Sequence, residues 1–547
     1  MKKLIIVCLV ALSGFLRAQN DLSIVAVGNV SPLTKEVVTK ESDVAKTKDT
    51  TLPAPQFTYT LQTKRYLTDV KIDTIKPAKL GNEPVQKLYR TYARLGVGNY
   101  SSLYGEFSVM SLRSKTGAWG AHVRHFSAGG GPKDVAGDYS GFNRQDVNLY
   151  GKRFLKKHVL YGAFDYDRDA VFNYGSVSPF SSFEKGATRQ YYNYFAPSMR
   201  LQSHYTDSTA INHDIGLRYY HLADRYEVKE DNIKLDATLG RYIRTEHLSV
   251  DFGVDYNHNA SASDSASNTI VKLQPTFSAS GNKFQAAIGI GMVYESVDAG
   301  AMYFYPQASF SYDIINHILV PYVTLGGYLE RNSFRSLTLE NPFLLNTEAF
   351  HLKNTQHKYE LAAGLRGSLT KDLAYDVRAS RYDLVNAPFF VNTTGAQDIF
   401  QNKFAVVYDN ASVINVHGQL EWQQFEKVRL VAAGDWYRYN MDVEAHPWHT
   451  PTLRLSLIGE YNLRDKILAR TQLYYLNGQY AKIPQGTAFE SVTLKGLVDV
   501  NIGLEYRYTK FLSLFLNVNN IAAQRYQRWY AYPTQKFNVL GGLTYTF

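Results

Sequence analysis

Apolar and polar residues alternate along most of the chain from about residue 87 to its end. In the stretch 247–259, HLSVDFGVDYNHN, every second residue from Leu248 to Tyr256 is apolar, whereas the residues between them are Ser, Asp or Gly. The stretches 453–463, LRLSLIGEYNL, and 497–508, LVDVNIGLEYRY, repeat this pattern. Because successive side chains of a β-strand point to opposite faces, each stretch predicts a strand with one apolar and one polar face.

These predicted strands are long. A strand of a soluble sandwich usually has about 5 or 6 residues, whereas a tilted strand that crosses a bilayer needs about 9–11. The stretch 497–508 falls in the second class. We therefore predict an all-β, antiparallel transmembrane β-barrel whose apolar face meets lipid and whose polar face lines a wet lumen.

Short turns separate these stretches at one end, and long loops such as 167–190 and 330–356 separate them at the other. Short turns on one rim and long loops on the other are typical of outer-membrane barrels. Ten short turns join twenty strands, and one strand before and one after them give 22. The turn centres are predicted near Ser114, Lys156, Asp207, Thr245, Asn282, Asn316, Lys371, Glu426, Asp465 and Thr509.

The N-terminal part of the chain differs from the rest. Residues 1–18 predict a secretory signal peptide, with Lys2 and Lys3 before an apolar run and cleavage after Ala18. Residues 19–85 are rich in Thr, Lys, Val and Pro and predict a flexible or extended segment, periplasmic or lumenal; residues 86–547 form the barrel. The single cysteine, Cys8, lies in the predicted signal peptide, so we expect no disulfide in the mature chain.

Composition sharpens this interpretation. The chain has 42 Tyr and 29 Phe, and such amphipathic or apolar rings suit a membrane–water boundary. A Tyr-rich soluble β protein is the alternative. The formal net charge is +10, but the basic residues are scattered rather than clustered, which argues against nucleic acid as a partner.

The polar face carries charges that the alternation places inside the barrel. They form either a charged pathway for a solute or a solvated, internally paired lumen, and we favour the second. We find no catalytic, cofactor-binding or metal-binding motif, so we predict no enzymatic activity and no cofactor, although an enzyme barrel stays a third hypothesis. The candidate lumen-facing residues are Asp251, Asp255, Asp376, Arg378, Asp435, Asp499, Glu505 and Arg507.

The chain ends on an alternating strand, QKFNVLGGLTYTF. We expect this strand to pair with the first strand, because closure leaves no free edge in the membrane. Its aromatic end resembles the signal that the barrel assembly machinery of bacterial outer membranes recognises. The residues predicted to face lipid and to carry this signal are Phe537, Val539, Leu543, Tyr545 and Phe547.

The last 31 residues, from Asn517, also resemble the final hairpin of TonB-dependent outer-membrane receptors. A second resemblance to that family covers NPFL (341–344) and YELAAGLR (359–366). The family has a 22-stranded barrel that encloses a folded N-terminal plug, and residues 19–85 are too short for one and contain no recognisable TonB box. The matching positions of the final hairpin are Asn519, Asn520, Ile521, Tyr526, Tyr532, Pro533, Gly542, Tyr545 and Phe547.

The resemblance implies an outer-membrane protein for passage or uptake of a solute, without an ordinary plug. The alternative is a structural or assembly subunit of an outer-membrane complex, whose N-terminal segment binds a periplasmic partner. Outer-membrane lipid and the assembly machinery are expected partners in both cases, and a periplasmic or outer-membrane protein partner is left open. A wide barrel must also be filled, by the N-terminal segment, by long loops that fold inward, or by a partner.

Overall fold

The computed structural model describes residues 88–547, except 133–134, 136–138, 177–184, 206–209, 298–299, 426 and 487. The predicted signal peptide and the predicted extended segment, residues 1–18 and 19–85, lie outside the described residues.

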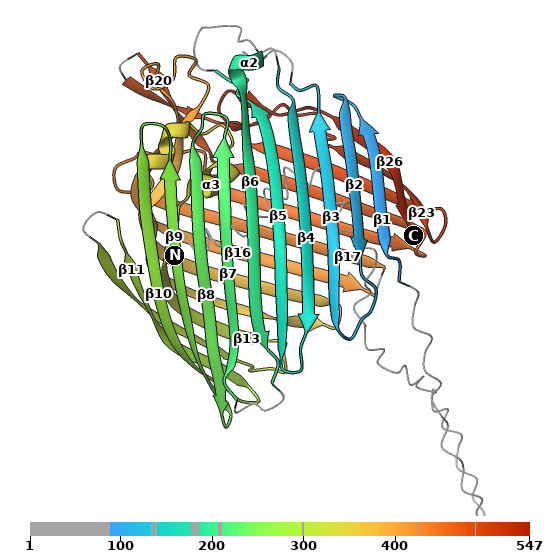
Figure 1. Ribbon diagram of the computed structural model, residues 1–547, viewed down its shortest axis with the longest axis vertical. Helices are drawn as coiled ribbons and strands as arrows, with labels where there is room; N and C mark the ends of the chain where they lie inside the picture. The colour runs from blue at the N-terminus through green and yellow to red at the C-terminus, as the bar shows by residue number, and fades with distance from the viewer. Residues whose placement is uncertain are drawn as a thin grey trace, which may run out of the picture. The chain divides into compact units, whose positions relative to one another are not determined.

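Residues 91–546 form a closed antiparallel β-barrel of 22 strands (Figure 1). The barrel strands are β1 (Thr91–Gly98), β2 (Ser102–Met110), β3 (Gly117–Ala128), β4 (Phe142–Phe154), β5 (His158–Phe172), β6 (Arg189–Ser203), β7 (Asn212–Asp224), β8 (Lys229–Ile243), β9 (Glu246–Ala260), β10 (Ser265–Ser280), β11 (Phe284–Glu295), β12 (Ala301–Tyr312), β13 (Val320–Glu330), β14 (Thr355–Thr370), β15 (Leu373–Asn392), β16 (Phe404–Gln424), β17 (Val428–Met441), β18 (Leu453–Leu463), β19 (Ile467–Asn477), β22 (Leu497–Arg507), β23 (Leu512–Asn519) and β26 (Asn538–Thr546). The predicted fold class and strand number are confirmed.

The remaining elements belong to connections at one end of the barrel, which we call the long-loop end; α2 and β20 mark it in Figure 1. They are α2 (Lys185–Thr188), α3 (Phe334–Glu340), the 3₁₀ helix η1 (Asn346–Phe350), and the short hairpins β20 (Tyr480–Gln485) with β21 (Ala488–Thr493) and β24 (Gln527–Trp529) with β25 (Tyr532–Pro533).

The opposite end, which we call the short-turn end, carries the ten predicted turns. Each predicted centre falls between the two strands it was expected to join; Thr245, for example, lies between β8 and β9. Two of the centres, Asp207 and Glu426, are themselves outside the described residues, although the strands on either side of them are described. The turn pattern therefore gave the correct strand order around the barrel.

Large apolar side chains stay exposed on alternate positions of the strands. In β12, Met302 and Phe304 are each 59% exposed, and in β18, Leu455 and Leu457 are 44% and 43% exposed. An apolar surface that continues over many strands marks contact with lipid. Among the described residues, no helix has the length and apolar character needed to cross a membrane.

The last strand closes the barrel against the first. In the β1–β26 pair, Leu95 lies opposite Leu543 and Ala93 opposite Tyr545. The C-terminal residue is held as well, because the Thr91 N–H donates to the Phe547 carbonyl at 2.9 Å. Phe537, Leu543, Tyr545 and Phe547 are exposed, and Val539 is half-buried. Their role as an assembly signal stays a prediction.

Candidate functional site

Two long connections fold into the long-loop end of the lumen. The β13–β14 connection contains α3, and the β23–β26 connection contains β24 and β25. The first is fastened to the barrel wall at β16, because the Leu345 N–H donates to the Phe404 carbonyl at 2.8 Å and the Phe404 N–H donates to the Phe343 carbonyl at 3.0 Å. A backbone connection of this kind holds the loop in a defined place.

A carboxylate from the opposite wall holds the start of α3. Ser333 caps the helix in a capping box with Ser336, and the Arg335 N–H donates to Glu230 of β8 at 3.0 Å. Glu230 also accepts hydrogen bonds from the Tyr220 hydroxyl and from Asn257. A helix N-terminus carries free N–H groups and a partial positive charge, so a fixed carboxylate stabilises it.

The side chain of Arg335 ties α3 to a third place on the wall. Its guanidinium lies 3.2 Å from the Asp167 carboxylate of β5 and 3.1 Å from the centre of the Tyr194 ring of β6. An ion pair and a cation–π contact together compensate for removing this charge from water.

Aromatic residues join these loops into one packed layer, which we call the loop layer. Phe343 stacks on Tyr532 with ring centres 3.8 Å apart, and Phe404 contacts Trp529 at 5.6 Å. The buried cluster includes wall residues of β6 and β7 as well as β15 and β16, so the loop layer reaches from one side of the lumen to the other. Its members from the β13–β14 and β23–β26 connections and from β16 are Phe334, Leu337, Leu344, Ala349, Phe404, Trp529 and Tyr532.

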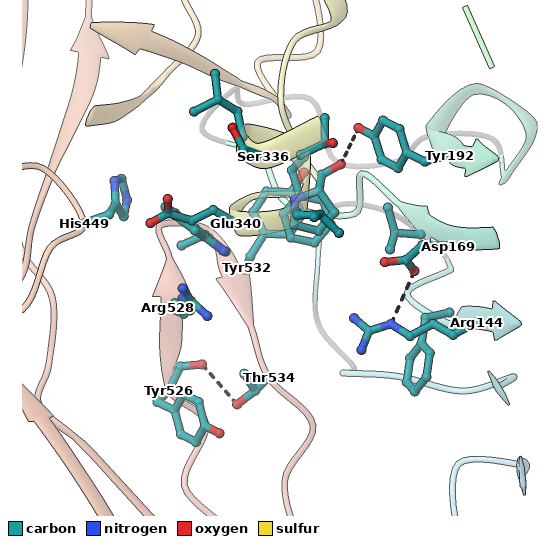
Figure 2. Close-up of a pocket in the computed structure, with 18 of the residues that line it drawn as sticks. Arg144, Asp169, Tyr192, Ser336, Glu340, His449, Tyr526, Arg528, Tyr532 and Thr534 are labelled. Atoms are coloured by element: carbon teal, nitrogen blue, oxygen red, sulfur yellow. Dashed lines mark hydrogen bonds and ion pairs between the residues drawn. The ribbon is translucent and has the colours of Figure 1, made fainter. Parts of the chain in front are cut away.

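A cavity of about 700 Å³ lies between the loop layer and the barrel wall (Figure 2). Its lining includes residues of β3 to β7 and of β13, β15, β17, β18, β19, β22, β23 and β26, together with α3 and the β24–β25 hairpin. Because strands far apart around the barrel contribute, the cavity lies in the lumen. Its size is in the range of small-molecule sites.

On the β3–β5 side of the cavity, each of three carboxylates is paired with an arginine. Arg124 binds Asp146 through two hydrogen bonds of 2.8 and 2.6 Å. Arg144 lies 3.3 Å from Asp169 (Figure 2), and Asp167 pairs with Arg335 of the loop layer. None of these three carboxylates is therefore left without a positive partner.

The other side of the cavity contains Asp499, Arg454, Arg528 and His449. Asp499 accepts a hydrogen bond of 2.9 Å from the Tyr526 hydroxyl. Burial lowers the pKa of His449, a residue of the β17–β18 loop, to about 4. Its Nδ1 lies 2.9 Å from the Phe390 carbonyl, and its Nε2 accepts from the Tyr530 N–H at 3.2 Å. These contacts require a neutral ring with the proton on Nδ1.

The predicted lumen-facing residues lie on the strand face opposite to the exposed apolar side chains. Most of them contact another polar side chain there. The pairs are Asp251 with Thr238 at 2.5 Å, Asp255 with Arg331 at 2.8 Å, Asp376 with Tyr322 at 2.9 Å, Asp435 with His417 at 2.8 Å and Glu505 with Arg507 at 4.0 Å. Val377 is 50% exposed on the outer face. Because side chains alternate along a strand, its neighbours Asp376 and Arg378 both lie on the opposite, lumenal face.

Of the eight predicted residues, only Asp499 lines the cavity. Sequence reasoning missed Arg454, although it stands on the polar face of the stretch 453–463. It also missed Arg528 and His449, which lie in loops that have no periodic pattern. Within the described ranges, no group of three or more His, Cys, Asp or Glu side chains could hold a metal ion.

No protein-family model matches the sequence. No curated protein matches it either.

Solved structures do share its fold. The FrpB iron transporter from Neisseria meningitidis is 9% identical, with a TM-score of 0.67 over 85% of this chain and 82% of that one. The ferric-catecholate import receptor Fiu from Escherichia coli K12 is 12% identical, with a TM-score of 0.63 over 84% and 82%.

The pyoverdine receptor FpvA from Pseudomonas aeruginosa is 12% identical, with a TM-score of 0.63 over 85% of this chain and 79% of that one. All three are TonB-dependent receptors of the outer membrane. At this identity the likeness establishes the fold alone. The chain therefore has the closed 22-stranded β-barrel fold that these receptors share.

Proposed function

We propose that this protein passes a solute across the outer membrane and that the lumenal cavity is the place where the solute binds. One observation carries the proposal: a cavity of about 700 Å³ with a charged and aromatic lining lies inside a closed 22-stranded barrel. The proteins that share the fold are named as transporters and import receptors, which supports transport rather than catalysis. We propose no enzymatic role.

The loop layer would act as the barrier in this pathway. A solute that enters from the long-loop end meets the packed rings of Phe404, Trp529 and Tyr532, each less than 10% exposed. Passage requires the loop layer to open or to give way locally. Lid motions of this kind occur in many proteins on microsecond to millisecond timescales.

Liposome swelling tests the proposal. The mature chain, a chain without residues 19–85, and a Phe404→Ala/Tyr532→Ala variant are reconstituted and exposed to neutral and anionic solutes of increasing size. We expect the wild type to admit small solutes and the loop-layer variant to admit larger ones faster. Phe310→Ala, at a position 51% exposed on the outer face, should behave as wild type. Absence of swelling with all chains would refute transport.

The closed loop layer also favours a second candidate. A barrel whose long-loop end is sealed by its own aromatic residues could serve as a structural or assembly subunit of an outer-membrane complex. In that case residues 19–85 would bind a periplasmic protein. Purification of the wild type in mild detergent should then yield a stoichiometric partner, and a chain without residues 19–85 should lose it.

The location of the protein in the outer membrane is part of the same proposal. We propose that residues 1–18 are removed during secretion and that the aromatic C-terminal strand directs assembly into the outer membrane. N-terminal sequencing of the purified protein should begin at Gln19. Fractionation should place the protein with outer-membrane lipid, and Phe547→Ala should lower the amount of folded barrel without changing secretion.

A further inference from the structure

We propose that the part of the cavity between Arg454 and Arg528 binds an oxyanion, a carboxylate or a phosphate, carried by the solute. This inference rests on the proposed function, because it names the chemical class of the solute. It depends on two guanidinium groups, one from the wall strand β18 and one from the loop-layer hairpin β24.

The first guanidinium, that of Arg454, is buried with unused hydrogen-bond donors. Arg454 is 8% exposed, and its Nε and Nη1 have no hydrogen-bond partner in the described part of the chain. Its neighbour across the β17–β18 pair is Asp435, but the carboxylate of Asp435 is held by His417 at 2.8 Å. Buried N–H donors without a hydrogen-bond partner are unfavourable unless a ligand supplies one.

The second guanidinium, that of Arg528, lies in the cavity between Glu340 and the Tyr526–Thr534 pair (Figure 2). Over the residues that the structure describes, no hydrogen bond or ion pair fixes it. Burial is the main cause that lowers the pKa of Arg528; Glu340 opposes this shift, and the charge of Arg454 adds to it. Both guanidinium groups line the same cavity, and an anion bound between two like charges relieves their repulsion.

The other arginines of the cavity show why the anion would bind here. Arg124 and Arg144 each have a carboxylate partner, Asp146 and Asp169. Arg454 and Arg528 have no such carboxylate partner among the residues that the structure describes. The guanidinium group of an arginine presents its N–H donors in one plane. It can therefore donate two parallel hydrogen bonds to a carboxylate or a phosphate.

Aromatic rings flank this part of the cavity and suggest the body of the solute. The cavity lining includes Tyr526 and Trp529, which stand on either side of Arg528 in the chain. Their rings offer flat apolar surface beside the charge. We therefore infer a small anion with a planar apolar body.

Isothermal titration calorimetry on the full mature chain in detergent tests the inference. The probes are benzoate, phenyl phosphate and the uncharged benzyl alcohol. We expect the two anions to bind and benzyl alcohol not to bind; the stronger anion identifies which oxyanion is preferred. Arg454→Gln and Arg528→Gln should each weaken anion binding by about tenfold or more, because charge-assisted hydrogen bonds are lost.

Arg429→Gln is the matched control, since it removes a lumenal arginine outside the cavity lining that already pairs with a carboxylate, that of Glu421; it should change the affinity for the anions little. Native folding is checked for each variant by heat-modifiable gel mobility. Where a glutamine variant does not fold, Arg454→Lys or Arg528→Lys replaces it and should weaken binding less than tenfold, because the charge is kept and the fork is lost.

Equal affinity for benzyl alcohol and the anions, or an equal loss in Arg429→Gln and Arg454→Gln, would overturn the inference. Its failure differs from failure of the proposed function. A barrel that passes solutes into liposomes but binds neither anion keeps transport and loses the arginine site. A barrel that binds the anions but passes no solute keeps the site and loses transport.

Discussion

Two carboxylates on the same face of β8 have opposite surroundings. Glu230, at the long-loop end, is fully buried and accepts hydrogen bonds from Tyr220, Asn257 and the backbone of α3. Asp236, six positions further along the strand, has a side chain that is 47% exposed, with Lys234 and Lys272 at 3.2 and 3.8 Å. The strand pattern that places both inside the barrel is the same. What differs is the loop layer, which covers one end of the strand and not the other.

The same contrast recurs on the opposite wall. In β16, Asn415 is fully buried, whereas Glu421, on the same face and nearer the short-turn end, pairs with Arg429 and is 32% exposed. Exposed pairs of this kind contribute about 0–1 kcal/mol, whereas buried hydrogen-bonded groups contribute more. The long-loop end therefore holds the specific contacts of the lumen.

The largest expected effect on the free energy of unfolding comes from removing an aromatic ring from the loop layer. Phe404 is fully buried and contacts His449, Trp529 and Tyr532. Phe404→Ala should lower the free energy of unfolding in lipid vesicles by about 3–5 kcal/mol, because it leaves a cavity in a packed core. Denaturant titration measures this. A loss as small as that of the exposed Phe310→Ala would show that the loop layer is not packed as described.

A lipid-facing position adds a third environment to the comparison. Leu457 is 43% exposed on the outer face of β18, so Leu457→Arg should cost about 2–4 kcal/mol if it lies near the middle of the bilayer. Asp251→Arg changes a lumenal position toward the short-turn end, where the charge can stay hydrated, and should cost clearly less. The same denaturant titration compares them, and equal losses would contradict the assignment of the two faces.

The two carboxylates of β8 allow a direct test. Glu230→Ala removes the acceptor of Tyr220, Asn257 and the α3 N-terminus, and we expect a loss of about 1.5–3 kcal/mol. Asp236→Ala should change the free energy of unfolding by no more than about 1 kcal/mol. If the order of the two losses is reversed, the loop layer does not depend on the wall contact through Glu230.

The smallest expected effect is a pH dependence of the loop layer. His449 has its pKa lowered from 6.5 to about 4, so the opened loop binds a proton more readily than the folded loop. The contribution of the neutral ring is complete above pH 6.5 and is lost as the pH falls toward 4. At pH 5.5 the loss should be roughly 1 kcal/mol.

Hydrogen–deuterium exchange over residues 520–537, corrected for intrinsic rates, measures this loss between pH 7 and pH 5.5. His449→Gln offers both a donor and an acceptor without titrating, so its exchange should lack this pH dependence. Arg528, the charged group that acts on His449, is unchanged in both chains. The same acid-induced rise in His449→Gln would exclude the histidine as its cause.

The barrel wall could be predicted from the sequence because each strand and each turn is recognised from residues that are neighbours in the chain. A residue such as Thr245 marks a turn between two alternating stretches, and the alternation fixes which side chains face lipid. The closure of Tyr545 against Ala93 follows from the need to leave no edge. These rules need only neighbouring residues and the properties of the bilayer.

The loop layer and the cavity could not be predicted, because they depend on residues far apart in the chain. Arg335 meets Glu230 across 105 positions, and Arg331 meets Asp255 across 76. Asp255 was identified from its strand, but nothing in the sequence near it indicates Arg331. Arg528 lies in a loop, where no alternation of apolar and polar residues predicts the direction of a side chain.

The claim that the loop layer closes the lumen has a direct test. The only cysteine of the chain is Cys8, in the predicted signal peptide, so Asp236→Cys would place a single thiol in the lumen of the mature protein. Intact cells are treated with a large maleimide that cannot cross the membrane. We predict negligible labelling with the natural loop layer and rapid labelling when Phe404→Ala and Tyr532→Ala are added. Rapid labelling with the loop layer intact, or no change when its rings are removed, would contradict the claim.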